Sequence, residues 1–303
     1  MFVNASIMIQ DRSMELQQLR YVLAVAETNS FTRAADRCLV VQSALSHQIA
    51  KLERELGVRL FDRTSRRVAL TTAGTAFLPA ARQCLDAAER AAAEASAAVG
   101  LVRGRLAVGL IPTVAAVDIP AALRDFRRDY PDVRISMRVG ASEKLADQVK
   151  EGLLDVAFLG LPTSIQPRGV EARELARDRL VAVVPPDHPL AGKPSVTLKR
   201  LASEPFADLP PRTAGRLQSD QAFEAAGLVR DVAFEVSTAE LMARLVSERL
   251  AVALFASTYA PQLPGVATVE IKDAPGRVEY VVWSATGRSP AAAAFLALLG
   301  LTD

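Results

Sequence analysis

Residues 30–57 read SFTRAADRCLVVQSALSHQIAKLERELG and decide how the rest of the chain is interpreted. Leucine and isoleucine recur at helical spacing in the second half, so one face of a helix is expected to be buried. Ala34 and Ala35 are small enough for a preceding helix to cross closely, and Gly57 is a typical left-handed cap at a helix end. The pattern predicts two short helices joined by a tight turn.

The opposite face of the second predicted helix carries an unusual set of side chains. A surface helix usually exposes Glu and Lys, whereas this face has short or medium polar groups near its N-terminus, which suit hydrogen bonds to base edges. We therefore favour a helix-turn-helix over a generic helical hairpin. The candidate base-contacting residues are Gln42, Ser43, Ser46 and His47.

Three sequence blocks resemble the winged helix-turn-helix of LysR-type transcriptional regulators. They are FTRAA at 31–35, QSALSHQIAKLERELGVRLFDR at 42–63 and LTTAG at 70–74. The resemblance runs from about Met14 through the whole chain, with weaker motifs in its C-terminal part. One departure is Val41, where the family usually has Ser or Thr. A hydroxyl there would cap the second helix, so the cap is left to Ser43, to water or to nothing.

The segments around the helix-turn-helix supply candidate phosphate contacts. Residues 15–27 carry an apolar stripe and predict a scaffold helix, and residues 58–71 predict a short two-stranded wing. Residues 14–72 hold nine Lys or Arg against six Asp or Glu, a local excess that suits a DNA duplex. The wing tip is either a solvated turn or a contact to phosphates or the minor groove. The candidate phosphate-binding residues are Thr32, Arg33, Arg63, Arg66 and Arg67.

Length and composition indicate a folded protein of two or three domains. The chain has 303 residues, of which 50% are hydrophobic and 23% charged, and a net charge of +2. Two cysteines offer no disulfide framework. Residues 1–13 do not resemble a secretory signal and are expected to be a flexible extension, and the apolar run at 291–301 is too short to span a bilayer. We expect a cytoplasmic protein with no membrane partner.

Residues 72–103 are rich in alanine and predict a long linker helix. Its apolar positions alternate steps of three and four, which is typical of a coiled-coil seam, although Pro79 should kink the helix. We favour a dimerisation helix over a monomeric spacer, and similar proteins use this segment in that way. A homodimer or homotetramer is therefore expected. The predicted seam consists of Leu78, Ala81, Leu85, Ala88, Ala92, Ala95 and Val99.

From residue 104 onward, strand-like and helix-like segments alternate, which predicts an α/β domain with a parallel sheet covered on both faces. The resemblance implies two lobes like those of periplasmic binding proteins, because the last elements return to the first lobe. Lobe one is expected at 104–163 and 268–303, and lobe two at 164–267. The chain is expected to cross between the lobes near 161–167 and 264–270, which both contain proline.

A cleft between two such lobes is expected to bind a small-molecule effector at the carboxyl ends of the strands. Hydroxyl groups at helix starts suit a carboxylate or similar anion. The simpler interpretation is that these hydroxyls only cap helices; Ser237 with Glu240 matches a capping box, so we prefer Thr238 to Ser237 as a ligand contact. The candidate effector contacts are Thr113, Ser142, Arg212, Thr213 and Thr238.

The sequence gives no support for catalysis. His47 and His188 are the only histidines, so no histidine-based triad or metal cluster is expected in the cleft, and no cofactor is expected apart from the effector. Cys38 and Cys84 are expected to be small buried residues. The sequence therefore predicts a DNA-binding transcriptional regulator whose partners are an operator duplex, an effector and, for an activator, RNA polymerase. The alternatives are a two-lobed solute-binding protein and a protein that coats DNA without sequence preference.

Overall fold

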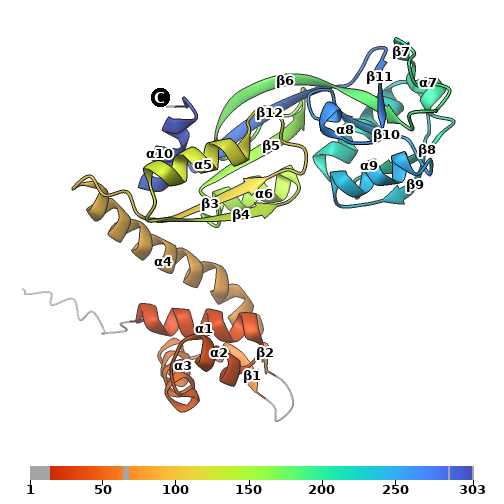
Figure 1. Cartoon of the computed structure of the whole chain (residues 1–303). Helices are drawn as coiled ribbons and strands as arrows, with labels where there is room; N and C mark the ends of the chain where they lie inside the picture. The colour runs from red at the N-terminus through yellow and green to blue at the C-terminus, as the bar shows by residue number, and fades with distance from the viewer. Residues whose placement is uncertain (1–13, 64–67, 286, 302–303) are drawn as a thin grey trace, which may run out of the picture. The chain divides into compact units, whose positions relative to one another are not determined.

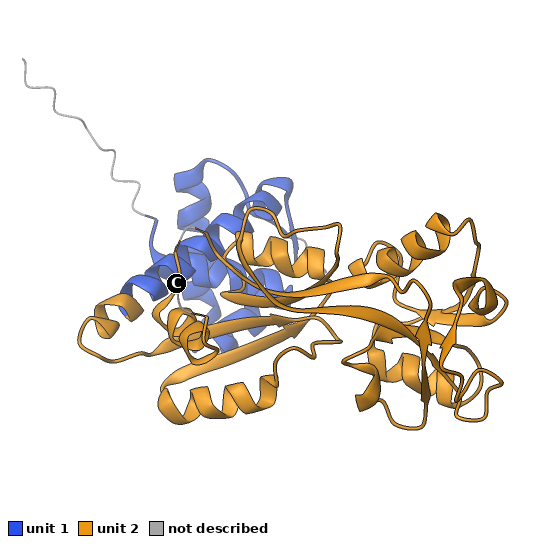
Figure 2. Ribbon diagram, turned by 90° about the horizontal axis from the view of Figure 1, so that it is seen from above, with its two compact units in different colours: residues 1–92 blue, residues 93–303 orange. Residues whose placement is uncertain are grey.

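The computed structural model describes residues 14–63, 68–285 and 287–301. The chain forms two compact units, residues 1–92 (unit 1) and residues 93–303 (unit 2), whose elements are labelled in Figure 1 and coloured by unit in Figure 2. The extension expected at residues 1–13 lies outside the described residues. None of the helices in the described ranges has the length and apolar character needed to cross a membrane.

Unit 1 contains the predicted helix-turn-helix and wing. The buried face of α3 contributes Leu45, Ile49 and Leu52 to a core that α1 and α2 complete, and Phe61 of the wing packs on the same core. Strands β1 and β2 pair antiparallel. The elements are α1 (Leu16–Thr28), α2 (Phe31–Arg37), α3 (Gln42–Leu56), β1 (Phe61–Arg63), β2 (Val68–Leu70) and the first part of α4 (Thr72–Ala97).

The helix ends of unit 1 follow local chemistry, with one exception. The Ser30 hydroxyl caps α2 by accepting a 3.3 Å hydrogen bond from the Arg33 N–H. Gly57 ends α3 in the left-handed conformation, with φ of 73°. Val41 precedes α3 and gives it no side-chain cap, and Ser43, itself the second residue of the helix, does not replace it.

Helix α4 includes Pro79, as expected, and ends at Ala97, before the end of the linker expected at residue 103. Val99 lies beyond the helix with 73% of its surface exposed, so it is not part of a helical seam. Cys84, expected to be buried, is exposed within this chain because it lies on an outward face of α4, whereas Cys38 is half-buried. Burial raises the pKa of the Cys38 thiol, although the nearby Arg37 opposes that shift.

Lobe one of unit 2 has the strand order β4–β3–β5–β12–β6. β3 is parallel to β4 and β5, as predicted, but β12 is antiparallel to both β5 and β6, so the sheet is mixed. Helices α5 and α10 cover one face and α6 the other. The elements are β3 (Gly104–Leu110), α5 (Ile119–Asp129), β4 (Val133–Val139), α6 (Ser142–Lys150), β5 (Val156–Pro162), β12 (Gly276–Trp283) and α10 (Pro290–Leu298).

Lobe two continues the same sheet through β6, which pairs with β10 and β11, and β11 pairs with β7. Strands β8 and β9 pair parallel to each other. The elements are β6 (Glu171–Val184), β7 (Ser195–Val196), α7 (Leu198–Leu201), β8 (Pro205–Asp208), α8 (Ala214–Ala225), β9 (Asp231–Glu235), α9 (Ala239–Ser247), β10 (Ala253–Ala256), η1 (Ala260–Gln262) and β11 (Ala267–Ile271).

Strand pairing locates both crossings between the lobes, and each lies later in the chain than the predicted range. The first crossing is made inside β6: Arg179 still pairs with Gly276 of β12, and Leu180 already pairs with Ala256 of β10. The return crossing follows β11, which belongs to lobe two, and lies at 272–275. Lobe one therefore consists of 104–179 and 276–301, and lobe two of 180–275.

Candidate functional site

The predicted DNA-reading face of α3 is open in unit 1. Gln42, Ser43 and His47 are exposed, and Ser46 is half-buried, while the opposite face of the helix is fully buried. The core side chains fix the orientation of the helix, so the polar side chains near its N-terminus face outward as a group. This arrangement is what a major-groove reader needs.

The candidate phosphate contacts have different surroundings. Thr32 and Arg33 are exposed in the first turn of α2, and the Arg33 guanidinium donates to the carbonyl oxygen of Thr28 near the end of α1. The backbone of Arg63 lies at the end of β1. Arg66 and Arg67 lie outside the described residues.

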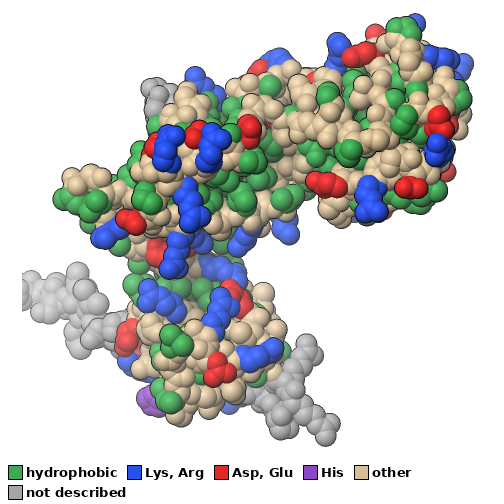
Figure 3. Space-filling model, in the orientation of Figure 1, with side chains coloured by type: hydrophobic (Ala, Val, Ile, Leu, Met, Phe, Trp, Pro, Cys, Tyr) green, Lys and Arg blue, Asp and Glu red, His purple; other side chains and the backbone are tan. Residues whose placement is uncertain are grey.

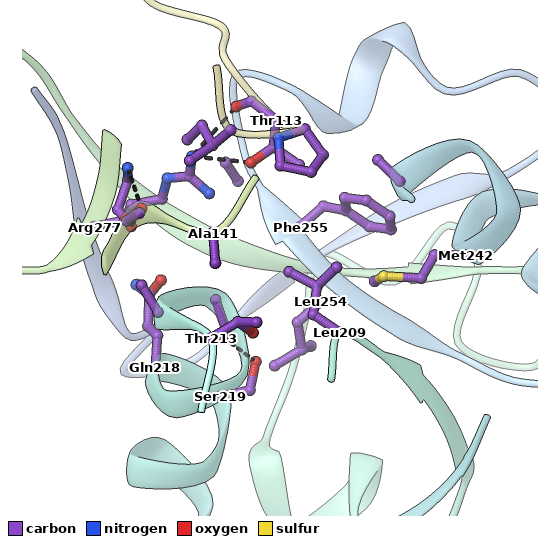
Figure 4. A pocket seen from close by; sticks show the side chains of 18 of the residues that line it. Thr113, Ala141, Leu209, Thr213, Gln218, Ser219, Met242, Leu254, Phe255 and Arg277 are labelled. Atoms are coloured by element: carbon purple, nitrogen blue, oxygen red, sulfur yellow. Dashed lines mark hydrogen bonds between the residues drawn. The ribbon is translucent and has the colours of Figure 1, made fainter. Parts of the chain in front are cut away.

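A cavity of about 270 Å³ lies between the two lobes of unit 2 and is shown in Figure 4. Lobe one contributes the polar residues Thr113, Ser142 and Arg277 together with small and apolar residues such as Ile111 and Val139. Lobe two contributes a largely apolar wall that includes Leu209, Met242, Leu254 and Phe255. The cavity thus has an apolar patch on the lobe-two side, while both lobes supply polar groups; those of lobe two are Thr213, Gln218, Ser219 and Ser237.

Arg277 and Glu279 form a buried ion pair on the lobe-one side of the cavity. Only 6% of Arg277 and 2% of Glu279 is exposed, and Arg277 Nη2 lies 3.4 Å from Glu279 Oε1. Nη2 also donates to the hydroxyl and the carbonyl oxygen of Thr113 at 3.0 and 3.3 Å, while Arg277 Nε is buried without a hydrogen-bond partner among the described residues. Burial lowers the pKa of Arg277, and the Glu279 carboxylate opposes that shift.

Glu279 also holds the loop that follows β3. Its Oε2 accepts hydrogen bonds from the N–H groups of Ala115 and Ala116 at 3.1 and 3.0 Å. Together with the two bonds from Arg277 to Thr113, these contacts tie the loop to β12. The ion pair therefore shapes the wall of the cavity and also places a cation beside it.

Three helices begin at the cavity. The first residues of α6, α8 and α9, namely Ser142, Ala214 and Ala239, all line it. Helix N-termini carry partial positive charge and attract anions. The Ser142 hydroxyl is fully used inside the protein, because it donates to the carbonyl oxygen of Gly160 and accepts from its N–H, both at 3.1 Å.

The remaining predicted effector contacts divide into two groups. Thr213 lines the cavity and caps α8 by accepting from the Arg216 N–H at 3.3 Å. Arg212 is exposed in a left-handed turn, with φ of 69°, and is not part of the cavity wall. The sequence suggests Arg212 because it stands between the strand at 205–208 and the following helix, but the residue is exposed and is not among those that line the cavity.

The expected roles of Ser237 and Thr238 are reversed in the structure. Thr238 is the N-cap of α9 and accepts from the Leu241 N–H at 3.3 Å, whereas Ser237 lines the cavity. Thr238 instead borders an adjoining pocket, beside Glu240, that shares Ile111, Pro112 and Val139 with the cavity. The helix begins one residue later than the capping-box motif suggested, which moves each hydroxyl to the other role.

Sequence reasoning missed Arg277, Glu279 and Gln218, which are all buried at or beside the cavity. A signal for the first two is present, because charges of opposite sign two residues apart on one face of an apolar strand are expected to be paired. Gln218 lies on α8 and has no comparable signal in the sequence.

The surface of unit 2 shows basic side chains over α5 (Figure 3), and two of its three arginines pair with neighbouring carboxylates. Arg124 pairs with Asp125 at 3.1 Å, and Arg128 pairs with Asp129 at 2.9 Å. We assign no nucleic-acid contact to this patch. Across the described ranges, His, Cys, Asp and Glu side chains form no group of three or more that could hold a metal ion.

Two family profiles match the chain. The LysR substrate binding domain matches residues 100–301, and the bacterial regulatory helix-turn-helix protein of the lysR family matches residues 16–75. The HTH-type transcriptional regulator YnfL of Escherichia coli is 38% identical over 257 residues, which cover 82% of this chain and 84% of that protein. The activator CmpR of Synechocystis sp. is 30% identical over 254 residues, which cover 83% and 81%.

Solved structures give the same result. Full-length CbnR in complex with its target DNA has a TM-score of 0.71 and 27% sequence identity, and the match covers 95% of this chain and 99% of that chain. A full-length variant of OxyR from Pseudomonas aeruginosa has a TM-score of 0.67 and 27% identity, over 94% and 95%.

Proposed function

The chain belongs to the LysR family of DNA-binding transcriptional regulators, and on this premise we propose that it senses a small carboxylate in the cavity between the lobes of unit 2. The observation that carries this proposal is the position of Arg277. Its guanidinium is almost fully buried at the cavity wall, and its three hydrogen bonds to protein groups all use Nη2. A buried cation with unused donors favours an anionic partner.

The two sides of the cavity define the ligand further. The start of α6 and Arg277 favour a carboxylate on the lobe-one side, and Leu254, Phe255 and Met242 favour an apolar body on the lobe-two side. Glu279 already balances the charge of Arg277, so a single negative charge on the ligand fits better than two. The proposed effector is a small monocarboxylic acid with an aliphatic or aromatic body.

We infer that effector binding alters the angle between the lobes and thereby the DNA affinity of a homodimer or homotetramer. In a coupled system of this kind, effector and operator change each other's affinity by the same factor. The proposed base contacts are Gln42, Ser43, Ser46 and His47, and the proposed phosphate contacts are Thr32, Arg33, Arg63, Arg66 and Arg67. A two-fold pair of such readers suits an inverted-repeat operator. No catalytic role is proposed.

A thermal-shift panel on the full-length protein tests the ligand class. We expect benzoate, phenylacetate or 3-methylbutyrate to raise the melting temperature, because a ligand present at about 100 times its Kd stabilises the folded state by about 2.7 kcal/mol. The matched neutral amides should have no comparable effect. Equal stabilisation by acids and amides would contradict the proposed role of a carboxylate.

A variant pair tests the role of Arg277. Replacing this residue alone leaves Glu279 buried without its partner, so we use Arg277→Met together with Glu279→Gln, which removes both charges at similar volume. The double variant should fold but lose the response to carboxylates. Retention of the full response would show that the ligand does not depend on the ion pair.

A further inference from the structure

Two apolar residues beside the DNA-reading helix α3 are exposed to solvent, so they add no buried apolar surface to the free protein. Leu39 is 92% exposed and adopts a left-handed backbone conformation, with φ of 56°. Val41 is 69% exposed and occupies the N-cap position of α3 without a side-chain hydrogen bond. Both residues lie in the turn between α2 and α3.

Each of these features has a local cost. The left-handed conformation is unfavourable for leucine and is normally taken by Gly, Asn or Asp. A valine at an N-cap leaves the first amides of the helix without the acceptor that Ser, Thr, Asp or Asn would supply. Because both apolar side chains stay exposed, no burial of apolar surface offsets these two costs.

The neighbouring residues show that the turn does not require this arrangement. Cys38 and Val40 pack against the core of unit 1, whereas Leu39 and Val41 are absent from that core. The chain therefore alternates inward and outward residues through the turn, and a polar residue would fit at either outward position. Violations of local rules that the fold does not explain tend to mark functional positions.

We propose that Leu39 and Val41 are specificity-determining residues that contact the C5-methyl groups of thymine in the operator. This inference rests on DNA binding through α3. Val41 directly precedes Gln42, the first residue of the exposed reading face, so an operator base edge that meets that face is close to the turn. The thymine methyl group is the apolar feature of base edges in the major groove, and it matches an exposed apolar side chain.

The backbone at the start of α3 supports the same placement. The N–H groups of Ala44 and Leu45 bond to the carbonyl oxygen of Val41 at 3.1 and 3.3 Å, so the helix is wound from its first turn despite the missing cap. The preceding N–H groups, at Gln42 and Ser43, point out of the helix start, where a DNA phosphate satisfies them as well as a cap does. A hydroxyl side chain at position 41 is therefore not needed to cap α3 when DNA is bound.

The test removes the methyl group from DNA without changing its hydrogen-bonding groups. A duplex is first selected from a random library with the full-length protein, and each thymine is then replaced by uracil in turn. We expect at least one replacement in each half-site to weaken binding of the unaltered protein about fourfold, the effect of losing one buried methyl group. The variants Val41→Ser and Leu39→Asn should lose this sensitivity at that position.

Matched controls separate base contact from a structural role. Val41→Ser adds a cap and Leu39→Asn relieves the backbone, so neither variant should melt below the unaltered protein. Val58→Ser changes another exposed valine, just beyond the C-terminal end of α3, and should keep the uracil sensitivity.

Three outcomes would overturn the inference. Uracil could be tolerated at every position, or the uracil effect could be the same in all variants. If a duplex has been selected, either result would contradict only the proposed contact to the thymine methyl group and not sequence-specific DNA binding. Failure to select any duplex would instead contradict the premise that the protein recognises sequence, and the inference with it.

Discussion

Gln218 of α8 donates a 2.6 Å hydrogen bond from Nε2 to the carbonyl oxygen of Gly276, the first residue of β12. The bond joins lobe two to lobe one beside the cavity, and only 4% of Gln218 is exposed. The amide therefore connects the two lobes at the point where the chain returns to lobe one.

We expect Gln218→Leu to weaken the contact between the lobes. The lost hydrogen bond should cost about 1 kcal/mol, which a thermal or urea unfolding curve of the full-length protein measures. Effector affinity should fall as well, because the lobes separate more readily. Gln221→Leu, on the exposed face of the same helix, is the control and should change neither quantity. Equal effects of the two substitutions would exclude a specific role for Gln218.

Gly160→Ala should distort the cavity. An added Cβ would clash with the Arg277 guanidinium and lie 2.8 Å from Ile111 Cδ1, and both neighbours are buried. Overpacking of this kind typically costs about 1–3 kcal/mol. We expect a lower melting temperature together with loss of carboxylate binding, because the guanidinium must move. Gly140→Ala is the control for the melting temperature, since its Cβ would meet Leu145 at 3.4 Å, an ordinary contact; carboxylate binding is not compared in it, because Gly140 also lines the cavity.

Asp178 should stabilise unit 2 near neutral pH, and this contribution to stability should be lost under acidic conditions. Burial raises the pKa of Asp178, but hydrogen bonds from Ser257 and Thr258 outweigh it, so the pKa is lowered overall. A lowered pKa means that the ionised carboxylate stabilises the fold above its ordinary pKa. That contribution is lost as the pH falls through the lower, folded-state value.

The measurement compares melting temperatures of the unaltered protein and Asp178→Asn between pH 7 and pH 3. The unaltered protein should melt higher at pH 7, and the difference should shrink below about pH 4. Ser257→Ala should reduce the difference at pH 7, because it removes one of the stabilising hydrogen bonds. A difference that stayed constant across the pH range would contradict this role of the carboxylate.

The proposed DNA contacts of unit 1 should be of two kinds, base contacts and phosphate contacts. Gln42→Ala should relax base preference and cost roughly 1–3 kcal/mol at one operator position. Arg63→Ala should weaken binding to all sequences alike and lower the salt slope by about one. A salt titration on matched and mismatched duplexes distinguishes them. The division fails if both substitutions change the slope and the preference in the same way.

The helix-turn-helix was predictable because its buried residues follow one period. Leu45, Ile49 and Leu52 stand at helical spacing, and all are fully buried. The strand at 171–179 gave no such signal, because its side chains are charged and largely exposed. The lobe boundary was therefore placed too early, in a proline-containing loop.

The sequence predicted where the cavity lies better than it predicted which side chains line it. Strand ends and helix starts indicated Thr113, Ser142 and Thr213, which do line the cavity. Which hydroxyl caps a helix depends on where the helix begins, and a shift of one residue exchanged Ser237 and Thr238. Arg277 reaches the cavity from β12, which follows the other cavity-lining segments in the chain, so local sequence context could not relate it to them.

Strand β6 belongs to the sheets of both lobes without interruption. A flexible loop between the lobes would let them swing apart. A continuous strand resists separation, because β6 is hydrogen-bonded to β12 up to Arg179 and to β10 and β11 after it, and both sets of bonds would have to be preserved. The lobes are therefore expected to twist about the strand through a small angle. A bound effector would then act at a distance by twisting the sheet, and the size of the twist would depend on the stiffness of β6 and of the return crossing at 272–275.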